Sequence, residues 1–502
     1  MKRIFILFVP FIIASISDQS VLAETPDSNQ SVKSQVVIKG ESGKAEKSNQ
    51  LVNIELIQPD KLKEDLDFLF KTIEEVHPNM FAYTTKQEFE PLKKQSYEKT
   101  CKPMSPFDFY KATAPVVASL KNSHTYLLPN LEDIKNYIKT GGKVFPLALS
   151  WDGSNVYIAK NYSSVEILLG AKILKINGEP ANQIVESFNK CSASEGKYPN
   201  NEVLGSPLTI RQKTCIVLFY SYFGPMKEWE FDIEKNNGKV CNCNVESVDY
   251  LQLKKKQKAI FDDYHYKYKL GYNTGIITLN SMCDFTNPEK SGNFEEFLRE
   301  TFQNIKDARV SHLIIDIREN PGGDSRAGDK LLEYLTGKPF RQSENVQTKI
   351  SCYIFGNEQN PSRLPAKYRN KKIGSIVQFE GPFIKPKENP LRFNGKVFVL
   401  TGHDTCSAAM SFSAAIKCFK IGIIIGEETG DPTVGYGDSL RFTLPNSKLT
   451  LSVACRYFSE ACGKPDGRGV IPDYEVKQKP ENTAKGIDTV LQFTLDLIEK
   501  AN

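Results

Sequence analysis

Several features that mark other classes of protein are scarce or missing in this chain of 502 residues. The formal net charge is only +5, and the basic residues are scattered, so nothing indicates a nucleic-acid partner. Neither a Walker lysine nor a GxGxxG spacing is present, which argues against a nucleotide site. Cys241 and Cys243 have no second pair or nearby histidine to complete a zinc site. We therefore expect no nucleic-acid partner, no metal and no cofactor.

Apolar runs long enough to cross a membrane are also missing. The N-terminus carries an apolar run, Ile4 to Ile16, that follows two basic residues and precedes a small-residue pattern ending at Ala23. This run is shorter than the roughly 20 residues that span a bilayer, and the order of features is that of a secretory signal peptide. We predict a signal peptide over residues 1–23. The mature protein would be exported, periplasmic or secreted, without a stable membrane span.

Composition and length indicate an ordinary soluble protein with more than one domain. Hydrophobic residues make up 40% and charged residues 25%, close to globular averages, and the length suggests about three domains. Export permits disulfides, but eleven cysteines are an odd number, so at least one thiol stays unpaired within a monomer. The pairing is not predicted, and association with further copies of the chain is left open.

Changes of pattern divide the chain. Residues 24–50 are polar and are predicted to be a flexible leader. Residues 51–135 carry apolar residues at helical spacing, which predicts an N-terminal helical domain. Residues 140–248 change to short β-like runs that include "ILKING", with a hairpin-type Asn-Gly turn, and this region resembles a PDZ domain. Strand addition of a peptide is one use of such a domain.

Residues 265–500 alternate strands with helices, which predicts an α/β core with a mostly parallel sheet. The expected fold class is therefore multidomain α/β: a helical domain, a PDZ-like β domain and an α/β catalytic core. Within the core, residues 337–393 are irregular and rich in Pro and Lys. This insertion is either a lid over a site or a solvated segment without a catalytic role.

The segment "KVFVLTGHDTCSAAMSF" predicts a strand, a sharp turn and a helix, with Ser407 at the turn. In α/β folds this geometry presents a side chain at the carboxyl end of the sheet, where sites are found. The amide of Ala408 would lie at the helix N-terminus, where negative charge is favoured. By local rules alone, a helix cap is the favoured interpretation of Ser407, because serine is among the preferred capping residues. Its neighbour Cys406 is a competing nucleophile.

Two further signals concern the partners of such a nucleophile. Gly322 and Gly323 follow a buried strand and permit a close backbone approach to a ligand. A hydroxyl nucleophile needs a base, and the chain has five histidines. Among them, His124 in "NSHTYL" ends the helical domain where the chain turns toward the β region.

An ordered set of motifs resembles one peptidase family. "NSHTYL", a PDZ-like segment, "DIRENPGG", "TCSAAM", "GEETG" and "GRGVIPD" follow one another as in the serine peptidases that include the C-terminal processing (tail-specific) proteases and tricorn protease. The likeness spans residues 60–499. In the C-terminal processing branch the serine pairs with a lysine after the "GExTxG" segment, but here Asp431 stands at that place. "SHT" at residues 123–125 matches the tricorn-like branch, in which a histidine is the base.

The resemblance implies the roles of the site residues. Ser407 is the nucleophile and His124 the base, while Ser123 helps position the catalytic group. Asp466, in "DGRGVIPD", is at the place of an acidic residue that orients the histidine, with Glu460 as its substitute.

In that scheme the amides of Ala408 and of Gly322 or Gly323 hold the oxyanion. The protein is expected to be an exported serine endopeptidase that hydrolyses polypeptides through an acyl-enzyme. The alternatives are a peptidase selective for C-terminal tails, or a catalytically silent peptide- or ligand-binding protein on the same fold.

Overall fold

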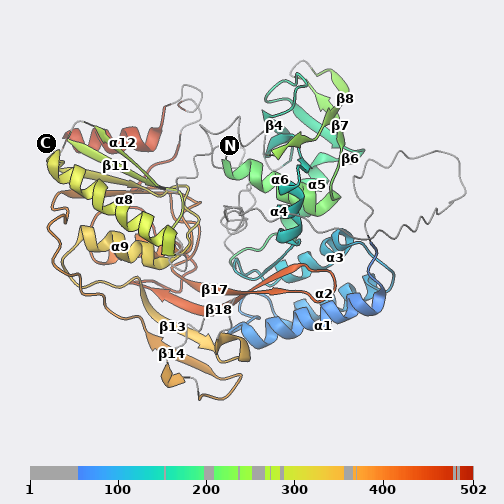
Figure 1. Cartoon of the computed structure of the whole chain (residues 1–502), viewed down its shortest axis with the longest axis horizontal. Helices are drawn as coiled ribbons and strands as arrows, with labels where there is room; N and C mark the ends of the chain where they lie inside the picture. Colours follow the sequence, from blue (N-terminus) through green and yellow to red (C-terminus); the bar gives the residue numbers. More distant parts are fainter. Residues whose placement is uncertain are drawn as a thin grey trace, which may run out of the picture.

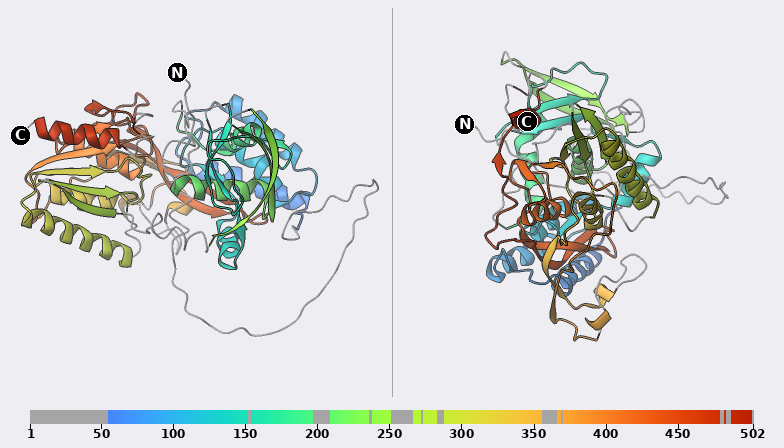
Figure 2. Two further views of the ribbon diagram at one scale, coloured as in Figure 1. Left: turned by 90° about the horizontal axis from the view of Figure 1, so that it is seen from above. Right: turned by 90° about the vertical axis from the view of Figure 1, so that its left-hand side faces the viewer.

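The computed structural model describes residues 55–151, 154–196, 209–235, 238–250, 266–271, 273–282, 288–355, 366–368, 370–478, 482 and 487–500. The predicted signal peptide and the leader lie outside the described residues. Figures 1 and 2 show an α/β lobe next to a second lobe, and the long strands β17 and β18 extend from one to the other. The fold is thus mixed α/β and built from several units.

The α/β lobe is organised around a six-stranded sheet in the order β10-β11-β12-β15-β16-β19, parallel except for β10. Helices α8, α9 and α10 share a core with one face, and α12 packs on the other. The predicted parallel sheet is confirmed. The bounds are β10 (Tyr266–Gly271), β11 (Thr274–Leu279), α8 (Pro288–Asp307), β12 (His312–Asp316), α9 (Ser325–Leu335), β15 (Lys396–Thr401), α10 (Ala408–Cys418), β16 (Ile423–Gly426), β19 (Tyr474–Glu475) and α12 (Thr489–Lys500).

A second sheet connects the ends of the chain. Strand β18 pairs with β1, β13 and β17, and β14 extends the sheet from β13. The N-terminal helices pack on this sheet in one shared core. The stretch 337–393, expected to be irregular, supplies β13 and β14. The bounds are α1 (Pro59–Val76), α2 (Lys86–Lys99), α3 (Pro106–Ala118), β1 (Tyr126–Leu128), β13 (Ser343–Lys349), η1 (Cys352–Phe355), η2 (Ala366–Tyr368), β14 (Ile376–Glu380), β17 (Val434–Thr443) and β18 (Thr450–Glu460).

The remaining unit, here called the β domain, contains an antiparallel sheet in the order β3-β4-β5-β7-β8. Between β5 and β6, Asn177 and Gly178 have positive φ angles of 49° and 81°, which the predicted Asn-Gly turn requires. Phe145 stacks on Phe219 of α6 at 3.6 Å between ring centroids. The bounds are α4 (Leu131–Lys139), β2 (Lys143–Val144), β3 (Leu147–Trp151), β4 (Val156–Asn161), β5 (Lys172–Ile176), β6 (Glu179–Pro180), α5 (Ala181–Cys191), α6 (Thr209–Phe223), β7 (Glu228–Glu234), β8 (Val240–Glu246) and β9 (Val248–Asp249).

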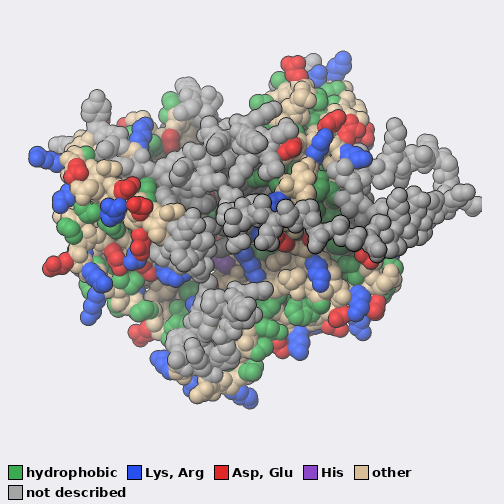
Figure 3. Space-filling view, in the orientation of Figure 1, with side chains coloured by type: hydrophobic (Ala, Val, Ile, Leu, Met, Phe, Trp, Pro, Cys, Tyr) green, Lys and Arg blue, Asp and Glu red, His purple; other side chains and the backbone are tan. Residues whose placement is uncertain are grey.

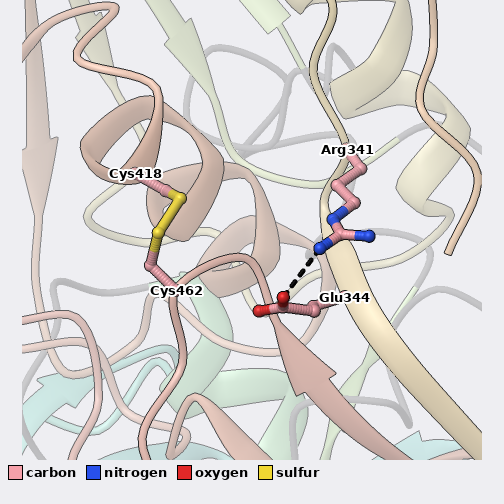
Figure 4. Close-up of a disulfide and its surroundings, with 4 residues drawn as sticks. All are labelled: Arg341, Glu344, Cys418 and Cys462. Atoms are coloured by element: carbon pink, nitrogen blue, oxygen red, sulfur yellow. Dashed lines mark hydrogen bonds and ion pairs between the residues drawn. A yellow bond between two sulfur atoms is a disulfide. The ribbon is translucent and has the colours of Figure 1, made fainter. Parts of the chain in front are cut away.

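One disulfide, Cys418–Cys462, joins the C-terminal end of α10 to the loop after β18 (Figure 4). Cys241 and Cys243 both carry free thiols on β8. Lysine and arginine side chains alternate with acidic ones over the visible face in Figure 3. Among the helices that the structure describes, none is both long and apolar enough to cross a membrane.

The attachment of α1 to the turn between β17 and β18 can be tested at Asp65. Its buried carboxylate accepts the backbone N–H groups of Asn446 and Ser447 at 2.8 and 2.7 Å. Asp65→Ala would leave these donors without their acceptor, and we expect a loss of about 2 kcal/mol or more in unfolding free energy. Urea unfolding followed by circular dichroism measures it. The exposed Asp60→Ala, on the same helix, should change stability by less than about 0.5 kcal/mol; equal losses would contradict this assignment.

Candidate active site

Ser407 occupies the turn between β15 and α10 in a conformation that is unusual for serine. Its φ and ψ are 48° and −125°, and positive φ is costly for a residue with a Cβ. Its side chain forms no capping hydrogen bond with α10, so it does not act as the helix cap that local rules allowed. Its backbone N–H donates to Asp431 Oδ2 at 2.6 Å. The hydroxyl is thus presented by a strained turn that other groups hold in place.

The turn before Ser407 is anchored to the end of β12. Thr405 Oγ1 donates to Ile317 O at 2.8 Å, and Cys406 N donates to Asn320 O at 3.0 Å. Gly322 lies against the same turn, because a Cβ there would be 2.7 Å from Ser407 Cβ. The two segments that the sequence pattern singled out are therefore packed against each other.

The backbone N–H groups near Ser407 differ in whether they already have a hydrogen-bond acceptor. Gly322 N–H donates to Asn320 Oδ1 at 2.9 Å, so this amide already has an acceptor. Gly323 (φ 137°) and Ala408, the first residue of α10, are then the two amides that could face an anion beside Ser407. Of the two glycines expected to contribute, the geometry favours Gly323.

Cys406, the competing nucleophile, has a buried side chain. It is 1% exposed, and its Sγ lies 3.4 Å from His403 O. Burial, together with the nearby charge of Asp431, raises the pKa of the thiol well above its usual value. Since the thiolate is the reactive form, this environment suppresses its nucleophilicity.

His124 lies directly before β1 and is held by the neighbouring strand β18. Ser452 Oγ donates to His124 O at 3.1 Å, and Ala454 N donates to Thr125 Oγ1 at 3.0 Å. The ring is buried, and its Nδ1 lies 3.0 Å from Ser123 Oγ. Burial lowers the pKa of His124, while the charge of Asp431 opposes that shift. Asp431 is thus the group that interacts with both His124 and Ser407.

A second buried carboxylate, Glu195, lies on the other side of Ser123. It accepts Ser123 N–H and Ser123 O–H at 2.8 and 2.9 Å through Oε2. Burial raises the pKa of Glu195 to about 7, and the bonds from Ser123 oppose the rise. Its further donors are Asn122 Nδ2 (2.9 Å), Tyr83 Oη (2.8 Å) and Tyr436 N (3.3 Å).

The carboxylates expected to orient His124 form hydrogen bonds with other groups. Asp466 is exposed, and its Oδ1 accepts the N–H of Arg468 two residues later at 2.9 Å. Glu460 is buried and accepts hydrogen bonds from the hydroxyls of Ser411 and Ser343, at 2.9 and 2.8 Å. Sequence reasoning noted Asp431 only as a departure from a lysine. It missed Glu195, which no motif marks.

The other histidines have different surroundings. Burial lowers the pKa of His77 to about 3, and its ring packs 4.7 Å from that of Tyr436. His403 is half exposed and lies 3.9 Å from Glu427, and His312 opens β12. His265 lies outside the described residues. Within the described parts of the chain, no group of three or more His, Cys, Asp or Glu side chains is arranged to hold a metal ion.

A strained serine between a parallel strand and a helix is typical of the nucleophile turn of hydrolases on α/β folds. The sequence pattern of peptidase family S41 matches residues 273–476. Residues 273–476, which contain Ser407, therefore carry the pattern of peptidase family S41, in agreement with the predicted family.

Individual proteins agree with the family. A protein of Sulfurisphaera tokodaii described as a tricorn-like protease C-terminal subunit is 31% identical over 133 residues. That match covers 26% of this chain and 15% of the relative, so the chain spans a small part of that protein's length.

Solved structures with a similar fold include a CPAF mutant and mature CPAF in complex with lactacystin, both at 13% identity and a TM-score of 0.55. The first covers 84% of this chain and 94% of the CPAF chain, and the second 88% and 98%. At this identity the likeness concerns the fold.

The contact between the turns 402–407 and 429–431 can be tested at Gly430. A Cβ at this position would lie 1.9 Å from His403 O and 2.6 Å from Cys406 Sγ. Gly430→Ala should therefore displace the Ser407 turn and reduce peptidase kcat/KM by about tenfold or more. Gly292→Ala, in α8 with open space around it, is the matched control and should keep full activity. Equal activity of both variants would show that the contact is dispensable.

Proposed function

We propose that the protein is an exported serine endopeptidase, with Ser407 as nucleophile and His124 as general base. The observation that carries the proposal is the strained Ser407, whose N–H is bound by the same Asp431 that interacts with His124. Strain in a non-glycine residue is maintained only where the surroundings enforce it, and such residues gather at active sites. The buried thiol of Cys406 supports the choice of serine over cysteine.

The hydrogen bonds around Ser123 supply a tautomer suited to this role. Ser123 Oγ has one proton, which it donates to Glu195 Oε2. At 3.0 Å it must then accept the proton of His124 Nδ1. The lone pair of neutral His124 is consequently on Nε2, the nitrogen that would take the proton of Ser407.

The reaction follows from these positions. As Ser407 Oγ bonds to the peptide carbonyl carbon, its proton passes to His124 Nε2, and the carbonyl π electrons move to the oxygen. The amides of Ala408 and Gly323 would stabilise that oxyanion. The C–N bond then breaks, and the leaving amine takes the proton from His124. Water next attacks the acyl carbon and gives a proton to His124, and the ester C–O bond breaks as Ser407 Oγ takes that proton back.

Glu195 has a supporting part in this scheme. Its carboxylate is one hydroxyl group away from His124, so its negative charge favours the imidazolium that forms during attack. It follows α5 by four residues, so the β domain contributes a group to the site. Glu195 would act as a positioning residue, through Ser123.

The polypeptide substrate and the β domain belong to the same proposal. The β domain would be a PDZ-like unit, in which an extended peptide could add as a strand at an edge of the sheet. Residues 1–23 would direct export and be removed from the mature protein.

The central test uses an unfolded polypeptide and the purified mature protein. Ser407→Ala and His124→Ala should each reduce cleavage by about 1,000-fold or more, because each removes a group that forms or breaks bonds. Cys406→Ala should retain cleavage, since the thiol is not used. Product formation is followed by mass spectrometry of the fragments. Loss of activity in Cys406→Ala with full activity in Ser407→Ala would reverse the assignment.

The link from Glu195 to His124 is tested by a double-mutant cycle. Glu195→Gln and Ser123→Ala should each lower kcat by about tenfold or more with little change in KM. Both substitutions interrupt the same hydrogen-bonded connection from Glu195 through Ser123 to His124. The double variant should be no slower than the slower single variant. Tyr83→Phe, which removes a donor from the other oxygen of Glu195, should have a smaller effect. Multiplied effects in the double variant would show that the two residues act independently.

A further inference from the structure

We propose that Asp431 is a positioning residue with two partners, holding the Ser407 backbone in its reactive conformation and adding to Glu195 a second negative charge that stabilises protonated His124. This inference rests on the proposed function. It assigns the role of acidic partner of His124 to Asp431, whereas the sequence pattern pointed to Asp466. It also gives a function to the aspartate that stands where the C-terminal processing branch has its catalytic lysine.

The first line of support is the contact with the nucleophile. Asp431 is 7% exposed, and its Oδ2 accepts the N–H of Ser407 at 2.6 Å. A residue with φ near 48° is costly unless its backbone groups are held, and this N–H precedes the first turn of α10. A charge-assisted bond is stronger than a neutral one, so a carboxylate is well suited to the task.

The second line of support is the rigid placement of the carboxylate. Gly430 N donates to Thr405 O at 3.0 Å, which joins the Asp431 segment to the nucleophile turn. On the other side, Thr433 N donates to Arg468 O at 2.9 Å and Val470 N donates to Thr429 Oγ1 at 2.7 Å. Asp431 therefore lies between two fixed backbone segments, and its side chain has little freedom to leave Ser407.

The third line of support is the electrostatic environment of the site. The charge of Asp431 raises the pKa values of Cys406 and Glu195 and opposes the fall in the pKa of His124. Burial raises the pKa of Asp431, and the charge of His124 and the hydrogen bond from Ser407 N–H oppose that rise. These effects agree with the position that the hydrogen bonds of Asp431 and Gly430 give to this segment beside the nucleophile turn.

The direction of the pH effect follows from the groups around His124. His124 interacts with Ser123 of its own segment and with the backbone of Tyr436 on β17. The charged groups are Glu195, which follows α5 and acts through Ser123, and Asp431 of the 429–431 segment. Removing the charge of Asp431 removes an interaction that favours imidazolium, so the pKa of His124 falls. Since the base works in its neutral form, the acidic limb of the rate profile moves to lower pH while the plateau rate drops.

The experiment compares Asp431→Asn with Asp431→Glu. Asparagine keeps an oxygen for the Ser407 N–H but has no charge, whereas glutamate keeps the charge. We expect Asp431→Asn to lower plateau kcat/KM by about 10- to 1,000-fold and to shift its acidic limb to lower pH. Asp431→Glu should keep the limb near its wild-type position. A lower plateau without movement of the limb would reduce Asp431 to a structural role and overturn the proposal.

A second measurement is independent of turnover. In full-length Ser407→Ala protein labelled at histidine, the ring C–H resonance of His124, assigned by comparison with a His124→Ala variant, reports its titration. Adding Asp431→Asn should move the His124 titration to lower pH, and adding Asp466→Asn should leave it in place. If only Asp466→Asn moves it, Asp466 is the acidic partner and this inference fails. Failure of the proposed function would instead appear as an inactive wild-type protein.

Discussion

The hydrogen bond from Ser407 N–H to Asp431 is the interaction on which the site depends. It holds a serine in a left-handed conformation that the residue would otherwise avoid, and it sets the start of α10. Gly430 and Gly322 both lie where a Cβ would collide with the turn or with Ser407 itself. Close packing between backbone segments thus sets the position of the Ser407 turn and of the side chains that it carries.

The site is assembled from segments far apart in the chain. His124 follows the N-terminal helices, but its carbonyl and the hydroxyl of Thr125 are bound by β18, more than 300 residues later. Glu195 follows α5 of the β domain and binds Ser123. The arrangement therefore draws on the helical segment, the β domain and the α/β lobe together.

Local pattern was sufficient for some of this organisation. The apolar strand before Ser407, the small residues after it and the paired glycines at 322 and 323 indicated a strand-turn-helix site on a parallel sheet, and the sheet is confirmed. The motif order predicted the family. Strand β13 was missed because its sequence, "SENVQTK", is largely polar, and β14, "IVQFE", is short. Both are strands through tertiary pairing, β13 with β18 and β14 with β13.

The carboxylates were the least predictable part. Asp466 occupies the expected place in sequence, yet its loop is exposed, whereas Glu195 has no motif and is placed by tertiary packing alone. The central claim, that Ser407 is the activated nucleophile, is tested most directly by covalent labelling. A fluorophosphonate should form a one-to-one adduct on Ser407 in the wild-type protein, found by peptide mass spectrometry, and His124→Ala should greatly slow its formation. An adduct on another residue, or labelling unaffected by the loss of His124, would contradict the account.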